Sequence, residues 1–332
     1  MSKKRVLVTG ADGFIGSHLT EALVRAGYDT RAFVMYNSLN SWGWLDHAAA
    51  DVKGHFDVVP GDICDPHGVA NAMDGCDAVL HLAALIAIPF SYNSPDSYVS
   101  TNVKGTLNIL QAARRLGTER VISTSTSETY GTAQFVPITE DHPLNAQSPY
   151  AATKVAADQL ALSFQKSFGT PVSVLRPFNT YGPRMRLNDG RAIPAFMGQA
   201  LRGEDLTVFG DGSQTRSFCY VDDLIEGIYR LLFSDFSNPV NLGNPAEISI
   251  QDFALEILKL TNSNQKICFK PLPKDDPLKR QPDINLAKKV LNWQPQISRE
   301  EGMKMTFAFF QNVSDKQLYK IDHKDFSKHI KH

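Results

Sequence analysis

The 332-residue sequence is poor in cysteine, with only four, at positions 64, 76, 219 and 268. No two of them form a CxxC pair, and the nine histidines show no zinc-ligand spacing, so we expect no metal site. Scattered, reduced thiols are typical of a cytosolic protein, which predicts a cytoplasmic location. No stretch approaches the roughly 20 apolar residues of a transmembrane helix, so we expect no membrane span.

An excess of either charge is also missing, because 34 Lys and Arg residues face 35 Asp and Glu residues. A net charge of -1 gives no broad electrostatic surface for nucleic acid or an anionic membrane, and we expect neither partner. There is no internal repeat or low-complexity segment. The Lys- and His-rich tail, residues 313–332, is interpreted as a solvated end.

What is present is an alternation of short apolar runs and amphipathic stretches through the first half of the chain. The predicted strands are 6–9, 30–35, 57–59, 78–82, 120–123 and 172–175. The predicted helices between them are 17–26, 102–116 and 150–168. Strand and helix in turn are the pattern of a doubly wound α/β protein, so we predict a Rossmann-type parallel sheet with helices on both faces.

The pattern changes after Arg176, where RPFNTYGPRMRLNDGR contains two prolines and two glycines and is predicted to be a loop. Beyond it we expect short strands, helices near 221–233 and 250–260, and a strand in PVNLG. Residues 1–178, rejoined by about 217–243, are therefore predicted to form the dinucleotide-binding domain. Residues 179–312 are predicted to form mostly a smaller, mixed α/β substrate domain.

The segment TGADGFIG follows the first strand and opens the first helix. Glycine is required where the chain turns tightly and where backbone approaches a pyrophosphate, and the helix N-terminus offers free N–H groups to the phosphates. This context predicts a dinucleotide site. The residues expected against the cofactor here are Gly10, Gly13, Phe14, Ile15 and Gly16.

Two later strand ends fit the same cofactor. A carboxylate at Asp62, followed by Ile63, could accept from an adenine amine or could cap a turn. The small residues in Leu82-Ala83-Ala84 would let a cofactor lie against backbone. The acidic residue expected for the adenosine ribose is missing, because the second strand ends in FVMYN. A close pair of arginines for a 2′-phosphate is missing too, so NAD is favoured over NADP.

Tyr150 and Lys154 are four residues apart at the start of a predicted helix, with Ser148 as its N-cap and Pro149 at its first position. A phenol with a pKa of about 10 is a poor base at neutral pH, but a nearby ammonium and a cationic nicotinamide ring would favour its phenolate. Such a base could take a proton from a sugar hydroxyl while hydride leaves the same carbon.

Together these residues resemble the extended short-chain dehydrogenase/reductase family, specifically its nucleotide-sugar enzymes. The resemblance rests on TGADGFIG, YAATK, RPFNTYGPR and GDGSQTRSFCYVDD. It implies that Tyr150 is the catalytic base, that Lys154 holds the nicotinamide ribose and that Thr126 holds the sugar 4-hydroxyl. It places Ser127 and Glu128 near sugar C5 and C6, and Pro177 beside the nicotinamide. The substrate residues it implies are Asn179, Arg191, Thr207, Phe209, Arg216 and Arg280.

The two halves of the chain resemble different members of that family. Residues 1 to about 184 are similar to NAD-dependent 4,6-dehydratases of UDP-N-acetylglucosamine in nonulosonic (legionaminic-type) acid pathways, through YNSLNSWGWLD and HLAALIAIPFSYNSPDSY. Residues 186–295 are similar to UDP-glucuronate decarboxylases, through NDGR, PVNLGNP and PLPKDDPLKRQPDI. In the better-known hexose dehydratases an Asp precedes the Glu, where this chain has Ser127. Glu128 could remove the C5 proton or serve as a buried salt-bridge partner.

The resulting expectation is an NAD-dependent 4,6-dehydratase that converts UDP-N-acetylglucosamine to a 4-keto-6-deoxy sugar. The alternatives are a UDP-glucuronate decarboxylase, a UDP-sugar 4-epimerase, and a nucleotide-binding regulator that has lost catalysis. The resemblance also implies a homodimer formed by the Ala-rich helices 102–116 and 150–168. Trp42 and Trp44 would either anchor the loop after the second strand or cover the site.

Overall fold

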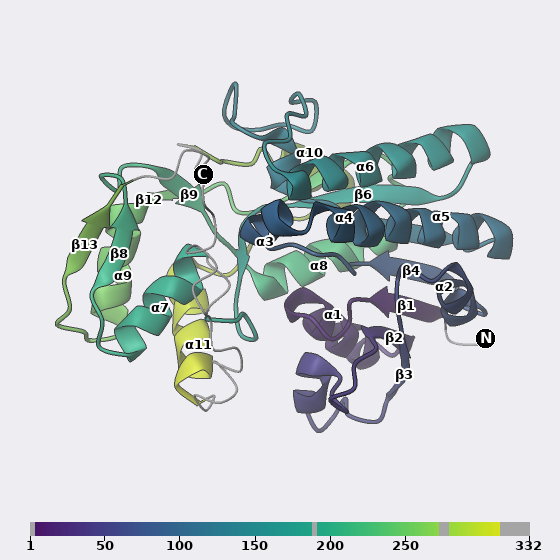
Figure 1. The fold of residues 1–332 in the computed structure, drawn as a ribbon, viewed down its shortest axis with the longest axis horizontal. Helices are drawn as coiled ribbons and strands as arrows, with labels where there is room; N and C mark the ends of the chain where they lie inside the picture. The colour runs from purple at the N-terminus through teal and green to yellow at the C-terminus, as the bar shows by residue number, and fades with distance from the viewer. Residues whose placement is uncertain (1–3, 188–190, 272–278, 313–332) are drawn as a thin grey trace.

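The computed structural model of the chain describes residues 4–187, 191–271 and 279–312. Seven parallel strands form the central sheet in the order β11-β6-β5-β4-β1-β2-β3 (Figure 1). Their bounds are β1 Arg5–Thr9, β2 Asp29–Met35, β3 Phe56–Gly61, β4 Ala78–His81, β5 Arg120–Thr124, β6 Val172–Pro177 and β11 Val240–Leu242. The predicted Rossmann-type sheet is confirmed, and the PVNLG segment supplies its last strand.

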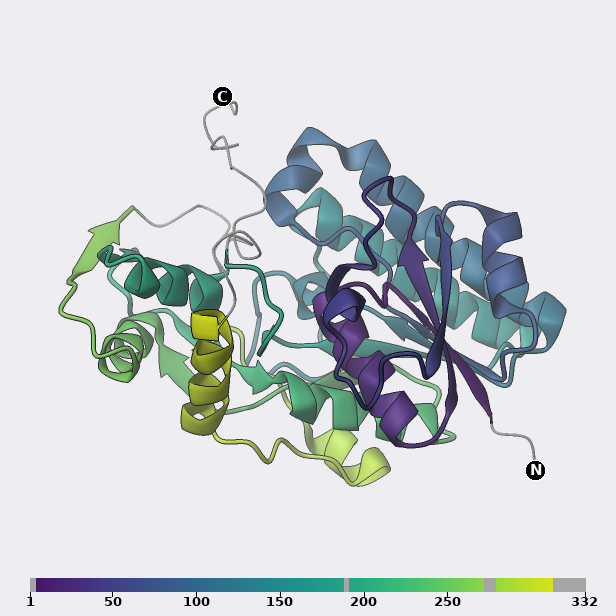
Figure 2. The same ribbon diagram turned by 90° about the horizontal axis from the view of Figure 1, so that it is seen from below.

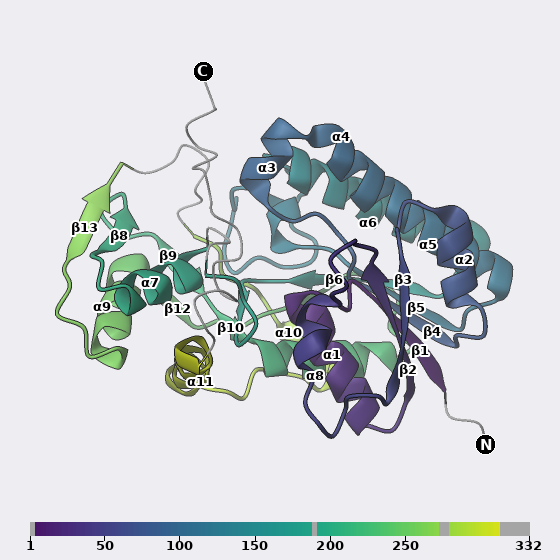
Figure 3. The same cartoon turned by 60° about the horizontal axis from the view of Figure 1, so that its bottom comes forward.

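Helices cover both faces of this sheet, as Figure 3 shows. On one face lie α2 (Pro66–Met73), α5 (Gly105–Leu116) and α6 (Pro149–Phe168), and on the other lie α1 (Phe14–Arg25) and α8 (Val221–Leu232). Successive residues of β1 alternate between two apolar cores, with Val6 and Val8 in one and Leu7 in the other. A strand buried on both faces is a nearly continuous apolar run, which is why these strands could be recognised from the sequence.

The smaller domain lies to one side of the sheet's carboxyl edge (Figures 1 and 2). Its helices are α7 (Ala192–Leu201), α9 (Ile250–Leu260) and α11 (Arg299–Asn312). Its strands are β8 (Leu206–Phe209), β9 (Thr215–Ser217), β12 (Glu247–Ser249) and β13 (Ile267–Lys270). The chain passes between the two domains near β7 (Thr180–Tyr181) and again near β10 (Cys219–Tyr220), and these two short strands pair in parallel. One apolar core runs continuously from the sheet into this domain.

Residues near 285–293, expected with the smaller domain, pack on the sheet domain instead. Helix α10 (Asn285–Leu291) lies against α8 and β11. Just after it, the indole of Trp293 is buried and donates to the Asp223 carbonyl oxygen at 2.9 Å. The chain therefore crosses back to the sheet domain before it forms α11.

The segment before α5 departs from the predicted continuous helix. Short helices α3 (Ile88–Asn93) and α4 (Pro95–Tyr98) lead into a π-helical stretch, η2 (Val99–Lys104), and α5 begins only at Gly105. A π-turn inserts an extra residue into the helical ladder and is often found at functional sites. Here it buries Asn102 against α6, where its side chain donates to the Thr153 hydroxyl. Two 3-10 turns, η1 (Gly43–His47) and η3 (Ser127–Tyr130), complete the described elements. Within the described ranges, no helix is both long and apolar enough to cross a membrane.

Candidate active site

The candidate site lies at the carboxyl ends of β1 and β4, where the strand order of the sheet reverses. Ligands of open α/β sheets bind at this switch point. The Thr9 hydroxyl oxygen accepts the Leu82 and Ala83 backbone N–H groups, both at 3.1 Å, and lies 2.9 Å from Nδ1 of His81. These bonds lock the two strand ends together beneath the glycine turn.

The glycine turn has the geometry that a dinucleotide requires. Gly10 has φ +67°, and a side chain there would bring Cβ within 2.9 Å of the Ala83 nitrogen. A side chain on Gly16 would collide with the Gly10 carbonyl. Gly13 precedes α1 in extended conformation with no side-chain cap, so the first N–H groups of α1, from Phe14 onward, face the turn. This cradle fits a nucleotide pyrophosphate.

The other predicted cofactor residues lie at the same sheet edge. Asp62 already accepts the Cys64 N–H at 2.8 Å through one carboxylate oxygen, which is the turn-capping role left open above. Ile63 is buried beneath Gly105, so it supports the site from below. Leu82, Ala83 and Ala84 directly follow β4 and are partly exposed beside the turn.

Helix α6 begins as predicted, because the Ser148 hydroxyl accepts the Ala151 N–H at 3.1 Å. This cap places Tyr150 in the first turn, where its side chain is buried and hydrogen-bonds with Thr126. Lys154, one turn later, donates to the Thr124 carbonyl oxygen at 2.6 Å. Tyr150, Lys154 and Thr126 therefore come together at the end of β5, as expected.

Without cofactor or substrate, burial is the main influence on the pKa of both Tyr150 and Lys154. Burial raises the pKa of the Tyr150 phenol, and the hydrogen bond with Thr126 and the charge of Arg191 only partly offset it. The expected opposing effect, a lower pKa, depends on the Lys154 ammonium together with an oxidised nicotinamide ring. Burial also lowers the pKa of Lys154 to about 8, against the opposing charge of Asp158. An additional positive charge beside Tyr150 would therefore be required to lower its pKa and stabilise the phenolate.

Glu128, expected near sugar C5, forms a two-point ion pair with Arg280. Arg280 Nη2 lies 3.0 Å from Glu128 Oε2, and Nη1 contacts Oε1. The Arg280 side chain is 6% exposed and the Glu128 side chain 26%. The charge of Glu128 also raises the pKa of Tyr150, so Glu128 lies near the Tyr150 phenol. Ser127 is buried in the same turn.

The remaining predicted substrate residues lie around the domain boundary. Arg191 acts electrostatically on Tyr150, although it caps α7 in the smaller domain. Pro177 ends β6, and two residues later the buried Nδ2 of Asn179 has no hydrogen-bond partner within the described residues. That amide fits an acceptor such as a phosphate oxygen. Arg216 lies buried in β9 and donates to the Thr215 carbonyl oxygen at 2.8 Å.

The β8 edge was expected to contact a uracil ring, but the hydrogen-bonding groups of Thr207 on this edge are already bonded to Gln199. The Gln199 side chain accepts the Thr207 N–H at 3.0 Å and donates to its hydroxyl at 3.1 Å. The Phe209 ring is exposed, so it is the part of this edge that can stack on a base.

A buried network behind Lys154 was not predicted. Asp158, one turn after Lys154, pairs with Arg176 at 3.2 Å, and Arg176 also donates to the Tyr130 hydroxyl at 3.0 Å. Tyr130 in turn donates to the Asn241 side chain at 2.7 Å, which ties β6 to β11. The i, i+4 spacing of Lys154 and Asp158 was visible in the sequence, but Arg176 and Asn241 join only through the tertiary fold.

The described residues form no group of three or more His, Cys, Asp or Glu side chains that could hold a metal ion. The site is thus built from a phosphate cradle, a Tyr–Lys–Thr cluster and arginines.

The sequence profile of the GDP-mannose 4,6 dehydratase family matches residues 7–306. The chain belongs to this family. It is an enzyme of the nucleotide-sugar epimerase, dehydratase and decarboxylase group of extended short-chain dehydrogenases/reductases.

Among curated members of the group, UDP-glucuronic acid decarboxylases are similar over nearly the whole chain. UDP-glucuronic acid decarboxylase 1 of Danio rerio is 39% identical over 323 residues, which is 95% of this chain and 74% of that protein. UDP-glucuronic acid decarboxylase 6 of Arabidopsis thaliana is 38% identical over 312 residues, or 91% of this chain and 87% of the relative.

Solved structures of the group share the whole fold. UDP-glucose 4-epimerase of Thermotoga maritima, solved with UDP-glucose, has a TM-score of 0.85 at 27% identity, covering 92% of this chain and 98% of its own. The dTDP-glucose 4,6-dehydratase DesIV of Streptomyces venezuelae, solved with NAD, has a TM-score of 0.84 at 29% identity, covering 92% and 97%. Structural relatives thus bind NAD and nucleotide sugars.

Proposed function

We propose that this enzyme uses bound NAD to oxidise a UDP-sugar transiently at C4, and that its substrate is UDP-glucuronate, which it decarboxylates. The observation that carries the choice is the buried Arg280 guanidinium, which pairs with Glu128, a residue whose charge acts on Tyr150. Glu128 takes both terminal nitrogens of Arg280, but the Arg280 Nε has no hydrogen-bond partner within the described residues and can donate to a second carboxylate. Of the candidate substrates, only glucuronate carries a carboxylate on C5. The 37–39% identity to curated decarboxylases supports the same reading.

The residues of the site divide the work of the first step. Tyr150 takes the proton of the C4 hydroxyl, and Thr126 orients that hydroxyl beside the phenol. Lys154 is fixed at the Thr124 carbonyl oxygen, where its ammonium can hold a ribose hydroxyl of the cofactor. Bound NAD would accept hydride from C4 and later return it, and its oxidised ring would supply the positive charge that favours the Tyr150 phenolate.

The second step follows from the C4 ketone. The bond between C5 and the carboxylate breaks, CO₂ leaves, and the electron pair moves onto the ketone as an enolate. C5 then takes a proton. Arg280 binds the carboxylate while it is present, and the neutral Ser127 hydroxyl does not repel it. An Asp at this position would place a second negative charge there, which favours dehydration over carboxylate binding.

Dehydration of UDP-N-acetylglucosamine is the second candidate. It is supported by the resemblance of residues 1–184 and by the position of Glu128, whose charge reaches the catalytic phenol. In that reaction Glu128 takes the C5 proton, the C6 hydroxyl leaves as water, and hydride returns to C6. Its ion pair with Arg280 disfavours Glu128 as this base, because the pair must open first.

The decisive experiment offers the purified enzyme UDP-glucuronate and UDP-N-acetylglucosamine separately and identifies products by mass spectrometry. We expect UDP-glucuronate to lose CO₂ and its product to carry one deuterium at C5 when the reaction runs in D₂O. No NADH should accumulate in solution, since hydride returns to C4. Loss of water from UDP-N-acetylglucosamine, with UDP-glucuronate unchanged, would overturn decarboxylation in favour of the dehydratase.

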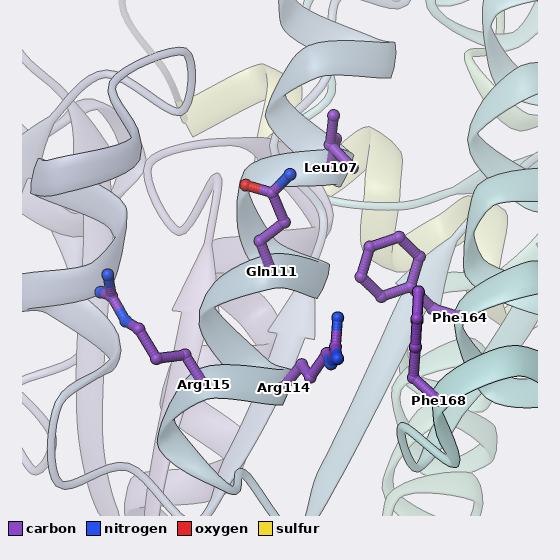
Figure 4. Close-up of a pocket in the computed structure, with 6 residues that line it drawn as sticks. All are labelled: Leu107, Gln111, Arg114, Arg115, Phe164 and Phe168. Carbon is purple, nitrogen blue, oxygen red and sulfur yellow. The ribbon is translucent and has the colours of Figure 1, made fainter.

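We also propose that the enzyme is a homodimer and that a second copy covers the outer face of α5 and α6. A hollow of about 630 Å³ lies between these helices, lined by Leu107, Gln111, Arg114, Arg115, Phe164 and Phe168 (Figure 4). Arg114 lies 4.0 Å over the centre of the Phe168 ring, which is 49% exposed. The alanines expected on this face, Ala112 and Ala161 among them, are buried toward the sheet instead.

A further inference from the structure

The end of β2 lacks the acidic side chain that commonly binds the adenosine ribose of NAD. Tyr36 and Asn37 follow the strand, and the hydrogen-bonding groups of the Asn37 side chain are used within its own loop. The Asn37 side chain donates to the Ser41 carbonyl oxygen at 2.8 Å and accepts the Leu39 N–H at 2.9 Å. Asn37 therefore cannot also bond two ribose hydroxyls.

The cation nearest in sequence, Arg31, is occupied elsewhere as well. Its Nη1 donates to the carbonyl oxygens of Ala72 at 2.8 Å and Asp74 at 3.0 Å, at the end of α2. Arg31 is early in β2, and this contact holds it away from the carboxyl edge of the sheet. It is not positioned to bind a 2′-phosphate.

A carboxylate reaches the end of β2 from another segment, the glycine turn. The turn is tied to the strand because Gly10 donates its N–H to the Phe33 carbonyl oxygen at 3.0 Å. Two residues on, hydrogen bonding by the Met35 backbone lowers the pKa of Asp12, although burial raises it more. The Asp12 side chain thus lies at the last residue of β2.

The loop after β2 holds Asp12 from the other side. Trp44 donates its N–H to the Asp12 carbonyl oxygen at 3.0 Å, and a Cβ on Gly43 would lie 3.0 Å from the Asp12 Cβ. The Trp44 ring packs at 5.7 Å against Phe309 of α11, so this loop is anchored rather than free. Asp12 is therefore fixed between the turn and the loop.

We propose that Asp12 binds the adenosine ribose diol and makes the site selective for NAD over NADP. The proposal rests on the function proposed above, in that a dinucleotide occupies the glycine cradle. Burial raises the pKa of the Asp12 carboxyl, and the charge of Arg186 partly offsets that rise. The ionised carboxylate can accept from both ribose hydroxyls. In NADP the same carboxylate would meet a 2′-phosphate of like charge.

The test uses full-length protein freed of bound nucleotide and measures cofactor affinity by calorimetry, without sugar substrate. Wild type should bind NAD and prefer it to NADP. Asp12→Asn should weaken NAD binding by roughly 10- to 100-fold, as expected for loss of charged hydrogen bonds, and should leave NADP binding unchanged or stronger. Asparagine keeps an acceptor oxygen for the Met35 backbone, so the turn should still fold.

Two comparisons separate ribose recognition from damage to the turn. The same variant should bind 2′-deoxy-NAD almost as wild type does, because the contact is already missing from that ligand. The control is Asp46→Asn, which disturbs the same loop through Ser41 and Trp42 but should not change the ratio of NAD to NADP affinity. Equal weakening of NAD, NADP and 2′-deoxy-NAD by Asp12→Asn, or no weakening of NAD, would overturn the proposal. Failure of wild type to bind any of the three would instead overturn the cofactor proposal itself.

Discussion

Arg280 holds the carboxylate of Glu128 through both terminal nitrogens, although 152 residues separate them in the sequence. Arg280 is almost completely buried, and its Nε has no hydrogen-bond partner within the described residues. A buried guanidinium with donor capacity left fits a second anion at the sugar end of the site. The pair gives Glu128 a positioning task, which weakens its candidacy as a free base at C5.

The first prediction concerns this guanidinium. Arg280→Lys keeps the positive charge but loses the planar fork, so kcat/KM for UDP-glucuronate should fall by roughly 10- to 100-fold, the range of one charged hydrogen bond. Steady-state kinetics measure the change. Arg299→Lys is the matched control, because Arg299 pairs with Glu256 in the smaller domain and should leave kinetics unchanged. Equal kinetics for wild type and Arg280→Lys would remove Arg280 from carboxylate binding.

The second prediction concerns the base. Tyr150→Phe should lower kcat by roughly 10² to 10⁴, because only the phenol oxygen can take the C4 proton, while NAD affinity should hardly change. Tyr98→Phe is the control. The Tyr98 ring lies 6.3 Å from the Tyr150 ring, and its hydroxyl donates to the Ala87 carbonyl oxygen at 2.5 Å. That control should lose some stability but keep activity, and a Tyr150→Phe rate within tenfold of wild type would exclude Tyr150 as the base.

The third prediction concerns the α5–α6 surface. Phe168→Glu should shift the protein from a dimer to a 36.7 kDa monomer, since a carboxylate on an apolar interface must be desolvated. Light scattering at micromolar concentration distinguishes the two. Phe233, exposed at the end of α8 on the other side of the sheet, offers the control Phe233→Glu, which should leave the dimer intact. A monomeric wild type would refute the dimer proposal.

Much of the fold could be predicted because its signals are local. Each central strand is an apolar run buried on both faces, and α6 carries its own cap in Ser148 and Pro149. Helix α7 was missed because Pro194 lies in its first turn and the sequence before it reads as a loop. The π-helical stretch at Asn102 was missed because a 3.6-residue period does not reveal one inserted residue.

The site shows the same division. Tyr150 and Lys154 are neighbours on one helix, so their spacing, taken together with the glycine turn upstream, predicted that they share one site. The partners of Glu128 and Asp158 could not be predicted in this way, because Arg280 and Arg176 come from distant segments that meet only in the folded chain. Burial raises the pKa of the Tyr150 phenol in the protein alone, and this effect could not be predicted from spacing.

The last prediction concerns His81, which is buried at the end of β4 between the hydroxyls of Thr9 and Thr106, at 2.9 and 3.1 Å. Burial, with the charge of Lys154, lowers the pKa of His81 to about 3 from 6.5. Between those values the unfolded chain holds a proton that the folded protein refuses, so stability falls as pH drops from 6.5 toward 3. This one group contributes a slope of about 1.4 kcal/mol per pH unit.

Urea denaturation at several pH values between these limits measures that slope. His81→Gln should be less stable near neutral pH, since its amide reaches the two hydroxyls less well, but its free energy of unfolding should fall less steeply on acidification by about 1.4 kcal/mol per pH unit. His67→Gln, on the exposed surface of α2, should follow the wild-type slope. Identical acid slopes in wild type and His81→Gln would show that His81 is not held neutral by the fold.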